Sequence, residues 1–208
     1  MTKEKRDNQT ETAILEAARR VFTQRGFDGA RMDEIAKAAG INRALLHYYF
    51  RSKDKLFDLV FAQRAREFFL GLVGIISGPG NLEEKIRAIV AHDIDMIRSQ
   101  PDLPIFIMQE LTQHPDRLVR MATESGANPS HMMKAFKLVV KEAIDKKQIR
   151  PIDAGQLLIN VMSLCVYPFI AKPMVKAVQE LDDKQFEKMI LRRKQEIVEF
   201  VMSSLKPM

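Results

Sequence analysis

Residues 32–50 read MDEIAKAAGINRALLHYYF, and this stretch decides the fold of the N-terminal part of the chain. Its residue order predicts a short helix over 32–39, a tight turn, and a second short helix over 43–49. Gly40 can adopt the left-handed backbone of such a turn because it has no Cβ atom. The apolar residues spaced to share a small core are Ile35, Ala36, Ile41, Leu46 and Phe50. The stretch therefore predicts a helix-turn-helix.

The second short helix carries side chains that suit double-stranded DNA. The residues expected at a groove or at phosphates are Arg43, Ala44, His47, Tyr48, Tyr49, Arg51, Ser52 and Lys53. An arginine can fork onto a guanine edge, alanine leaves room for a thymine methyl group, and histidine can donate to a base. Asn42 stands where it can cap the helix. A helix pair with glycine at its turn also occurs in proteins without a DNA role, so this geometry alone leaves both readings open.

Outside this stretch, the apolar residues keep a helical period, and no segment alternates as a strand would. In the first helix, the buried stripe starts at Ile14 and Gly26 is placed to end the helix. The ranges predicted to be helical are 10–25, 32–39, 43–49, 53–76, 82–99, 103–113, 129–147, 153–172 and 183–205. The sequence thus predicts an all-α protein. Short helices before Lys53 and long ones after it indicate a head over residues 1–52 on a body over 53–208.

Composition is compatible with an anionic partner and gives no sign of export. The 33 lysines and arginines exceed the 27 acidic residues, for a formal net charge of +6. The single cysteine cannot form an internal disulfide, and the N-terminus lacks an apolar signal stretch, so we expect a cytoplasmic protein. The uncharged run 154–171 is about as long as the shortest membrane spans. Because polar residues and Pro168 interrupt it, a buried interface helix explains it better, and we expect no membrane partner.

Five short segments together resemble one known family. They are Gly26-Phe27, Met32-Asp33-Glu34-Ile35-Ala36, Ala39-Gly40-Ile41-Asn42, Leu46-His47-Tyr48-Tyr49-Phe50 and Ser52-Lys53-Asp54-Lys55-Leu56. Their order is similar to that of the tetracycline-repressor-like (TetR/AcrR) transcriptional regulators, over roughly residues 10–60. The resemblance implies a three-helix head that reads a palindromic operator, a long fourth helix, an effector cavity, and a homodimer formed by the last two long helices. It implies a repressor released by a small molecule.

The resemblance also assigns residue roles, with some departures from the usual pattern. Arg43, Ala44 and His47 fall where the family contacts bases, and Tyr48, Tyr49 and Lys53 fall where it holds phosphates. The departures are Ala30-Arg31 in place of a Thr or Ser, Ala44-Leu45 in place of Gly-Thr, and His47 in place of an aromatic residue. Arg31 could substitute electrostatically. His47 could make DNA affinity depend on pH, or act as a neutral hydrogen-bonding side chain, which we favour.

The body offers candidates for binding a largely apolar effector. They combine apolar bulk with a few polar groups and are Phe69, His92, Met96, Met108, Phe136 and Tyr167. Core packing is the competing interpretation of each, because Met and Phe at helical spacing usually fill an interior. The run 154–171 and the final helix, with Phe186, Ile190, Ile197 and Phe200 among others, could form the seam of a homodimer. Cys165 is expected to pack as an inert thiol.

Two other classes of protein are compatible with parts of the sequence. A helical enzyme could use an apolar cavity with His92, Asp93 and Tyr167 as acid–base groups. However, the chain shows no glycine-rich phosphate loop, nucleophile elbow or metal-ligand spacing, so we expect no enzyme, cofactor or metal site. An architectural DNA binder would need no effector cavity.

Overall fold

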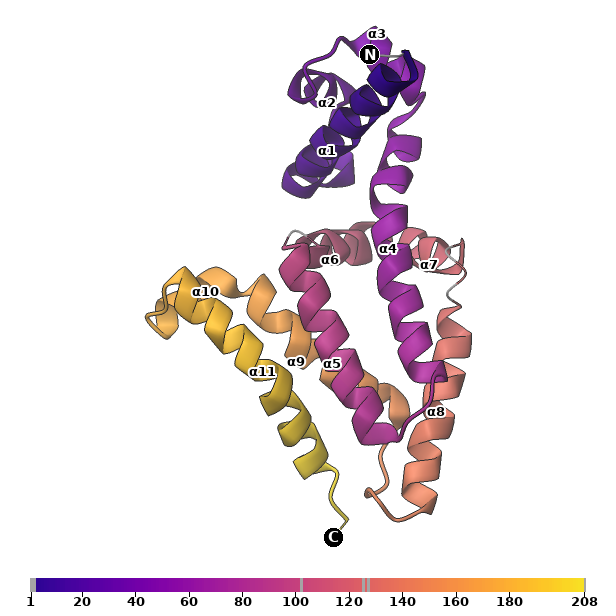
Figure 1. Cartoon of the computed structure of the whole chain (residues 1–208), viewed down its shortest axis with the longest axis vertical. Coiled ribbons are helices and arrows are strands. Elements are labelled where there is room, and N and C mark those ends of the chain that lie inside the picture. The colour runs from indigo at the N-terminus through magenta and orange to yellow at the C-terminus, as the bar shows by residue number, and fades with distance from the viewer. Residues whose placement is uncertain (1–2, 102, 125, 127, 208) are drawn as a thin grey trace. The chain divides into compact units, whose positions relative to one another are not determined.

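The computed structural model of the chain describes residues 3–101, 103–124, 126 and 128–207. Over these residues the regular structure is entirely helical, which confirms the all-α prediction (Figure 1). The helices are α1 (Lys3–Gly29), α2 (Met32–Ala38), α3 (Arg43–Tyr49), α4 (Lys53–Ser77), α5 (Leu82–Ser99), α6 (Leu103–Gln113), α7 (Pro115–Glu124), α8 (Pro129–Asp145), α9 (Ala154–Ile170), α10 (Lys172–Val178) and α11 (Asp183–Ser204).

Two of these helices, α7 and α10, were not predicted. Helix α7 follows α6 after the single residue His114, so no turn-rich segment marks the boundary. Helix α10 starts at Lys172, the residue at which the preceding helix was predicted to end. Within the described part of the chain, no single helix is both long and apolar enough to cross a membrane; α9 and α10 satisfy that criterion only together, with a bend of 76° between them.

The chain divides into two compact units. The first comprises Met1–Glu67 and Ile105–Ser125, and the second comprises Phe68–Pro104 and Gly126–Met208. Helix α4 therefore contributes its first part to one unit and its last part to the other. The boundary predicted between residues 52 and 53 lies inside the first unit, and it remains a prediction about function.

The core of the first unit is aromatic. The stripe predicted on α1 is buried, and it comprises Ile14, Ala17, Ala18, Val21 and Phe22. The ring of Phe22 meets that of Phe57 edge-on, at 4.9 Å between centroids. Gly26 was predicted to end the first helix; instead it has non-helical backbone angles, with φ 68° and ψ 177°, so α1 kinks there and continues to Gly29. This kink places Phe27 over Phe57 at 4.9 Å, where both rings join the core.

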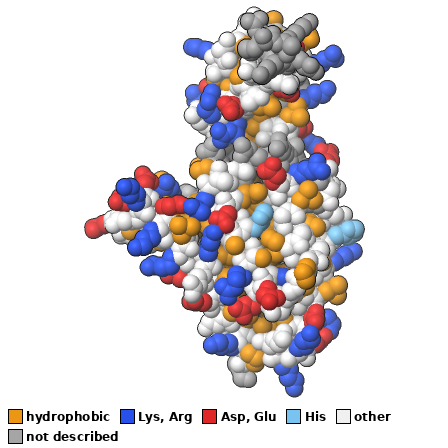
Figure 2. Space-filling view, in the orientation of Figure 1, with side chains coloured by type: hydrophobic (Ala, Val, Ile, Leu, Met, Phe, Trp, Pro, Cys, Tyr) orange, Lys and Arg blue, Asp and Glu red, His pale blue; other side chains and the backbone are white. Residues whose placement is uncertain are grey.

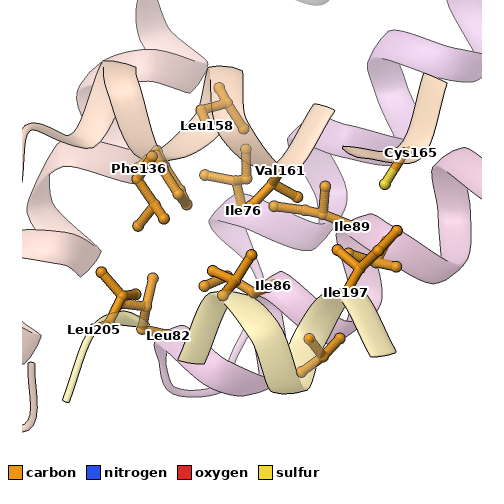
Figure 3. Packing of buried hydrophobic residues seen from close by; sticks show 14 of the residues in the cluster. Ile76, Leu82, Ile86, Ile89, Phe136, Leu158, Val161, Cys165, Ile197 and Leu205 are labelled. Carbon is orange, nitrogen blue, oxygen red and sulfur yellow. The ribbon is translucent and has the colours of Figure 1, made fainter. Parts of the chain in front are cut away.

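The second unit is built around α5, which packs against α8, α9 and α11. Apolar side chains of these helices interdigitate in one core, in which Ile86 and Ile89 of α5 face Val161 of α9 and Ile197 of α11 (Figure 3). Lys85 is buried beside this core, and its ammonium group donates to the carbonyl oxygens of Ile75 and Ile76 at 3.1 and 2.9 Å. These oxygens belong to the end of α4, where helical carbonyls lack intrahelical donors.

Candidate DNA-binding site

The helix-turn-helix has the geometry that its sequence predicts. Gly40 takes a left-handed backbone with φ 69°, and the backbone N–H of Ile41 returns to the carbonyl of Ala36 at 3.0 Å. Four residues of the predicted small core are buried, Ile35, Ala36, Leu46 and Phe50, whereas Ile41 is only half-buried. Helices α1, α2 and α3 pack in sequence (Figure 1). The core and the turn thereby fix the position of α3, and one face of this helix stays free of the core.

Asn42 fixes the start of α3. Its side-chain Oδ1 accepts a hydrogen bond from the backbone N–H of Leu45 at 2.8 Å, which confirms the predicted cap. Such caps stabilise a helix by about 0.5–2 kcal/mol. The amide oxygen of Asn42 therefore serves the helix, so a role of Asn42 in DNA binding includes setting the orientation of α3.

The outward face of α3 contains the predicted groove-facing residues. Arg43, Ala44, His47 and Tyr48 are all exposed, and Tyr48 has 79% of its surface accessible. Arg43 is held by Asp33 of α2, since Nε lies 3.2 Å from Oδ1 and Nη1 donates to Oδ2 at 3.2 Å. Its Nε also approaches Nε2 of His47 at 3.5 Å. These contacts orient the guanidinium along the same face as the imidazole.

Asp33 is a component of the site that the sequence reasoning missed. It was considered only as part of the family resemblance, whereas in the structure it forms a two-point ion pair with Arg43. A signal was present, because an acidic residue in the first turn of a helix that precedes a basic recognition helix can reach across the turn. Both side chains are largely exposed, so the pair is weak and DNA phosphates can compete with it.

The residues predicted to hold phosphates have different surroundings. The hydroxyl of Tyr49 donates to Oδ1 of Asp7 on α1 at 2.9 Å. The side chain of Lys53, the first residue of α4, reaches the C-terminal end of α1. Its ammonium group donates there to the carbonyls of Phe27 at 2.9 Å and Ala30 at 3.3 Å. A cation at a C-terminal helix end is stabilised by these carbonyls. A phosphate contact by Lys53 therefore has to be made in addition to this capping role, or in place of it.

Arg31 remains available as an electrostatic contact. It is exposed, its backbone is extended with φ −115° and ψ 139° immediately before α2, and its side chain does not cap that helix. Arg51 and Lys55, which follow α3 in the sequence, are also exposed cations. Figure 2 shows Lys and Arg side chains at several places on the head. This arrangement favours an anionic partner.

The six predicted effector residues differ in their surroundings. Phe136 is fully enclosed in the core of the second unit, Tyr167 is 60% exposed, and Met108 belongs to the first unit. His92 and Met96 lie one turn apart on α5 and are half-buried, as is Phe69 on α4. Tight packing at Phe136 matches the competing interpretation of a core side chain.

His92 fits closely against α4. Its Nε2 lies 3.2 Å from the carbonyl oxygen of Phe68, and its ring stacks on that of Phe68 at 5.7 Å between centroids. A Cβ atom added to Gly71 would come within 2.2 Å of the imidazole, so a glycine is needed for this approach. His92 thus joins α4 to α5 within the second unit. In the described residues no group of three or more His, Cys, Asp or Glu side chains could hold a metal ion.

The predicted dimer seam is partly buried within the chain itself. Phe186, Ile190 and Ile197 of α11 lie in the core of the second unit, because α11 packs on α5. The large apolar side chains that remain exposed on α9, α10 and α11 are Ile159, Tyr167, Ile170, Met174, Val178, Leu191 and Phe200. Exposed apolar residues on neighbouring helices are typical of a protein interface.

Comparisons with known proteins agree with this geometry. The family of bacterial regulatory proteins named tetR matches residues 14–60, and the tetracyclin repressor-like C-terminal domain matches residues 83–201. The HTH-type transcriptional repressor NicS of Pseudomonas putida is 31% identical over 150 residues, which make up 72% of this chain. The match covers 64% of NicS, just under two thirds of that relative.

Solved structures share the fold at low sequence identity. A Clostridium perfringens regulator whose name refers to fatty acid metabolism has a TM-score of 0.68 and 22% identity, over 93% of this chain and 98% of the other. The transcriptional regulator FadR of Bacillus subtilis, solved in complex with stearoyl-CoA, has a TM-score of 0.61 and 17% identity over the same shares. Because the C-terminal match alone covers more than half of the residues, the chain belongs to the tetR family of bacterial regulatory proteins.

Proposed function

We propose that this protein is a ligand-responsive transcriptional repressor, which binds a palindromic operator as a homodimer and is released by a small-molecule effector. The observation that carries the proposal is the exposed face of α3, where Arg43, Ala44, His47 and Tyr48 lie on a helix fixed by its cap and its core. The relatives are transcriptional regulators, which leaves the helical enzyme without support.

DNA recognition would use two kinds of contact. Arg43, Ala44 and His47 would meet base edges in the major groove, while Tyr48, Tyr49, Lys53 and Arg31 would hold phosphates. Arg43 would exchange the exposed carboxylate of Asp33 for a guanine edge, a fork-shaped acceptor of similar geometry. In this scheme residues 1–52 provide the DNA contacts, and residues 53–208 provide effector binding and dimerisation.

A homodimer would cover the exposed apolar residues of α9, α10 and α11. Tyr167 and Phe200 are the largest of them, and aromatic residues are enriched in protein interfaces. Two copies related by a twofold axis would present two α3 helices to successive major grooves, about 34–36 Å apart. This symmetry is the reason to expect a palindromic operator.

The effector is proposed to be largely apolar. The core of the second unit consists of aliphatic and aromatic side chains, and the half-buried His92 and Met96 lie on α5, which contributes to that core. The regulator FadR, which shares this fold, was solved in complex with stearoyl-CoA, a molecule with a long apolar chain. Phe69, Met108, Phe136 and Tyr167 remain proposed effector contacts, and local opening of the body would be required for Phe136 to take part.

Selection of bound sequences from random double-stranded DNA by the purified protein tests this function. Enrichment of a palindrome is expected, and gel-shift measurements with Arg43→Ala should then show loss of preference for that sequence. Salt-sensitive binding without any preferred sequence would instead favour the architectural DNA binder, because phosphate contacts carry no sequence information. No binding to any DNA would contradict the proposal.

A further inference from the structure

Asp93 occupies a core position of α5. It is 0% exposed, and it lies on the same face of the helix as Ile86, Ile89 and Ile97, which are also buried. This face of α5 packs against α9 and α11, within the apolar core of the second unit (Figure 3). A carboxyl group therefore stands where the helical pattern calls for an aliphatic side chain.

Neither carboxyl oxygen of Asp93 has a hydrogen-bond partner among the described residues. The other buried charged side chain there, Lys85, shows the usual situation, because its ammonium group donates to several backbone carbonyls. Burying a polar group without a partner is strongly unfavourable, and a charged one more so. A group of this kind in a folded protein calls for a physical explanation, such as a ligand that binds there.

Two other ionisable groups share this junction of three helices. The pKa of the Cys165 thiol on α9 is raised, mainly by burial and also by the charge of Asp93. The charge of Arg193 on α11 offsets part of this rise. The guanidinium of Arg193 is engaged elsewhere, since Nη2 donates to the carbonyl of Leu164 at 2.9 Å. Burial raises the pKa of Asp93 to about 7. Both the neutral and the ionised form of this carboxyl group are thus accessible near neutral pH.

The chemistry of the junction selects among possible partners. A metal ion would need further ligands, and the described residues supply no suitable cluster. A bound water would need two to four polar partners in surroundings that are mostly aliphatic. An anionic ligand would be repelled by the carboxylate. An ammonium group would neutralise the charge of the Asp93 carboxylate and donate hydrogen bonds to its oxygens. An apolar skeleton attached to that ammonium group would pack among the isoleucines.

We propose that Asp93 determines effector specificity, with its carboxylate binding the protonated amine of an otherwise apolar effector between α5, α9 and α11. This inference rests on the proposed function, in which the body binds the effector. Because Asp93 is fully enclosed in the unliganded protein, binding requires α9 or α11 to move away from α5. Movement of core helices on binding is also what would transmit a signal to the rest of the chain.

The test uses linear primary amines from butylamine to decylamine, together with phenylalkylamines, each matched with the alcohol and the hydrocarbon of the same skeleton. Calorimetric titration and thermal shift on the full chain measure binding without DNA. Amines should raise Tm and bind about tenfold more weakly at pH 6 than at pH 8, because most Asp93 side chains are neutral at the lower pH. The matched alcohols and hydrocarbons should bind more weakly and without that pH dependence.

Two variants separate a binding role from a structural one. Asp93→Asn and Asp93→Leu should both lose the amine response, and at pH 8 without ligand both should raise Tm by about 2–4 °C or more, since they replace a buried carboxylate with an uncharged side chain. Glu83→Gln, an exposed site on the same helix, is the matched control and should keep the amine response. Asp93→Asn preserves the shape of the side chain, so it decides the question even where Asp93→Leu fails to fold.

Several results would overturn the inference. They are an amine response that persists in Asp93→Asn, the absence of any amine response in the wild type at either pH, and a lower Tm of Asp93→Asn than of the wild type at pH 8, which would contradict a buried carboxylate without a partner. The binding measurements contain no DNA, whereas selection from random DNA contains no amine. Failure of this inference is therefore distinguishable from failure of the proposed function.

Discussion

The guanidinium carbon of Arg117 lies 3.8 Å from the centroid of the Phe27 ring. The same group lies 4.9 Å from the centroid of Phe57, and its Nη2 approaches Oδ1 of Asp54 at 3.5 Å. Its side chain is only 12% exposed. One arginine of α7 thereby contacts both the end of α1 and the start of α4, which makes α7 part of the same compact unit as the DNA-binding helices.

We predict that Arg117→Ala lowers the free energy of unfolding by about 1–2 kcal/mol, because it removes a largely desolvated cation from two aromatic rings. Arg117→Lys should be intermediate, since lysine keeps the charge but lacks the planar group that stacks. Urea unfolding followed by circular dichroism measures the effect. Arg120→Ala on the same helix is the control, because Arg120 is exposed and paired only loosely with Glu124, at 3.9 Å. Equal losses in Arg117→Ala and Arg120→Ala would contradict a specific role for Arg117.

The contacts of Arg117 also show where sequence reasoning reaches its limit. The helix-turn-helix could be predicted because Gly40, Asn42 and Leu46 act on neighbours only a few residues away. The docking of α7 depends on contacts between residues some 90 positions apart, such as Phe27 and Arg117, which no local pattern encodes. In the sequence, Arg117 lies in a segment for which no helix was predicted, and nothing there distinguishes it from other charged residues.

The candidate site follows the same division. The exposed face of α3 follows from helical periodicity, so Arg43, Ala44, His47 and Tyr48 were placed on it from sequence. The proposed dimer seam was only partly predictable, because an amphipathic α11 does not reveal whether its apolar face packs on its own chain or on a partner. In the structure Phe186 is buried within the chain while Phe200 is exposed. From sequence, Asp93 suggests only a possible acid–base group of an enzyme.

Asp33 is expected to restrain DNA binding through Arg43. Asp33→Asn removes the carboxylate that holds the guanidinium and also removes a negative charge from the DNA-facing side, so operator affinity should rise about two- to fivefold. Fluorescence anisotropy with the selected operator at several salt concentrations measures this effect. Asp145→Asn, which removes an exposed carboxylate paired with Lys141 on α8, is the control and should leave affinity unchanged. Weaker binding by Asp33→Asn would mean that the ion pair positions Arg43 productively.

His47 is expected to contribute one hydrogen bond to operator recognition. The imidazole is exposed on α3 beside Arg43, so His47→Ala should weaken operator binding about two- to tenfold while leaving dimerisation intact. Anisotropy titrations give the affinity, and light scattering gives the mass of the particle in solution. Unchanged affinity in His47→Ala would remove His47 from the site.

Asp93 should make the stability of the free protein depend on pH. Burial raises the pKa of this carboxyl group to about 7, whereas an unfolded chain holds aspartate near its ordinary value of about 3.9. Between these values the folded protein binds the proton and the unfolded chain does not, so the free energy of unfolding falls as the pH rises. The stabilisation is complete below about pH 4 and is lost as the pH passes through 7.

Urea unfolding of the wild type at pH 5, 6, 7 and 8, compared at each pH with Asp93→Asn, isolates this carboxyl group because all other titrating groups are shared. We expect the stability of the wild type relative to Asp93→Asn to decline by roughly 2–4 kcal/mol over this range, and a constant difference between the two proteins would show that Asp93 titrates normally.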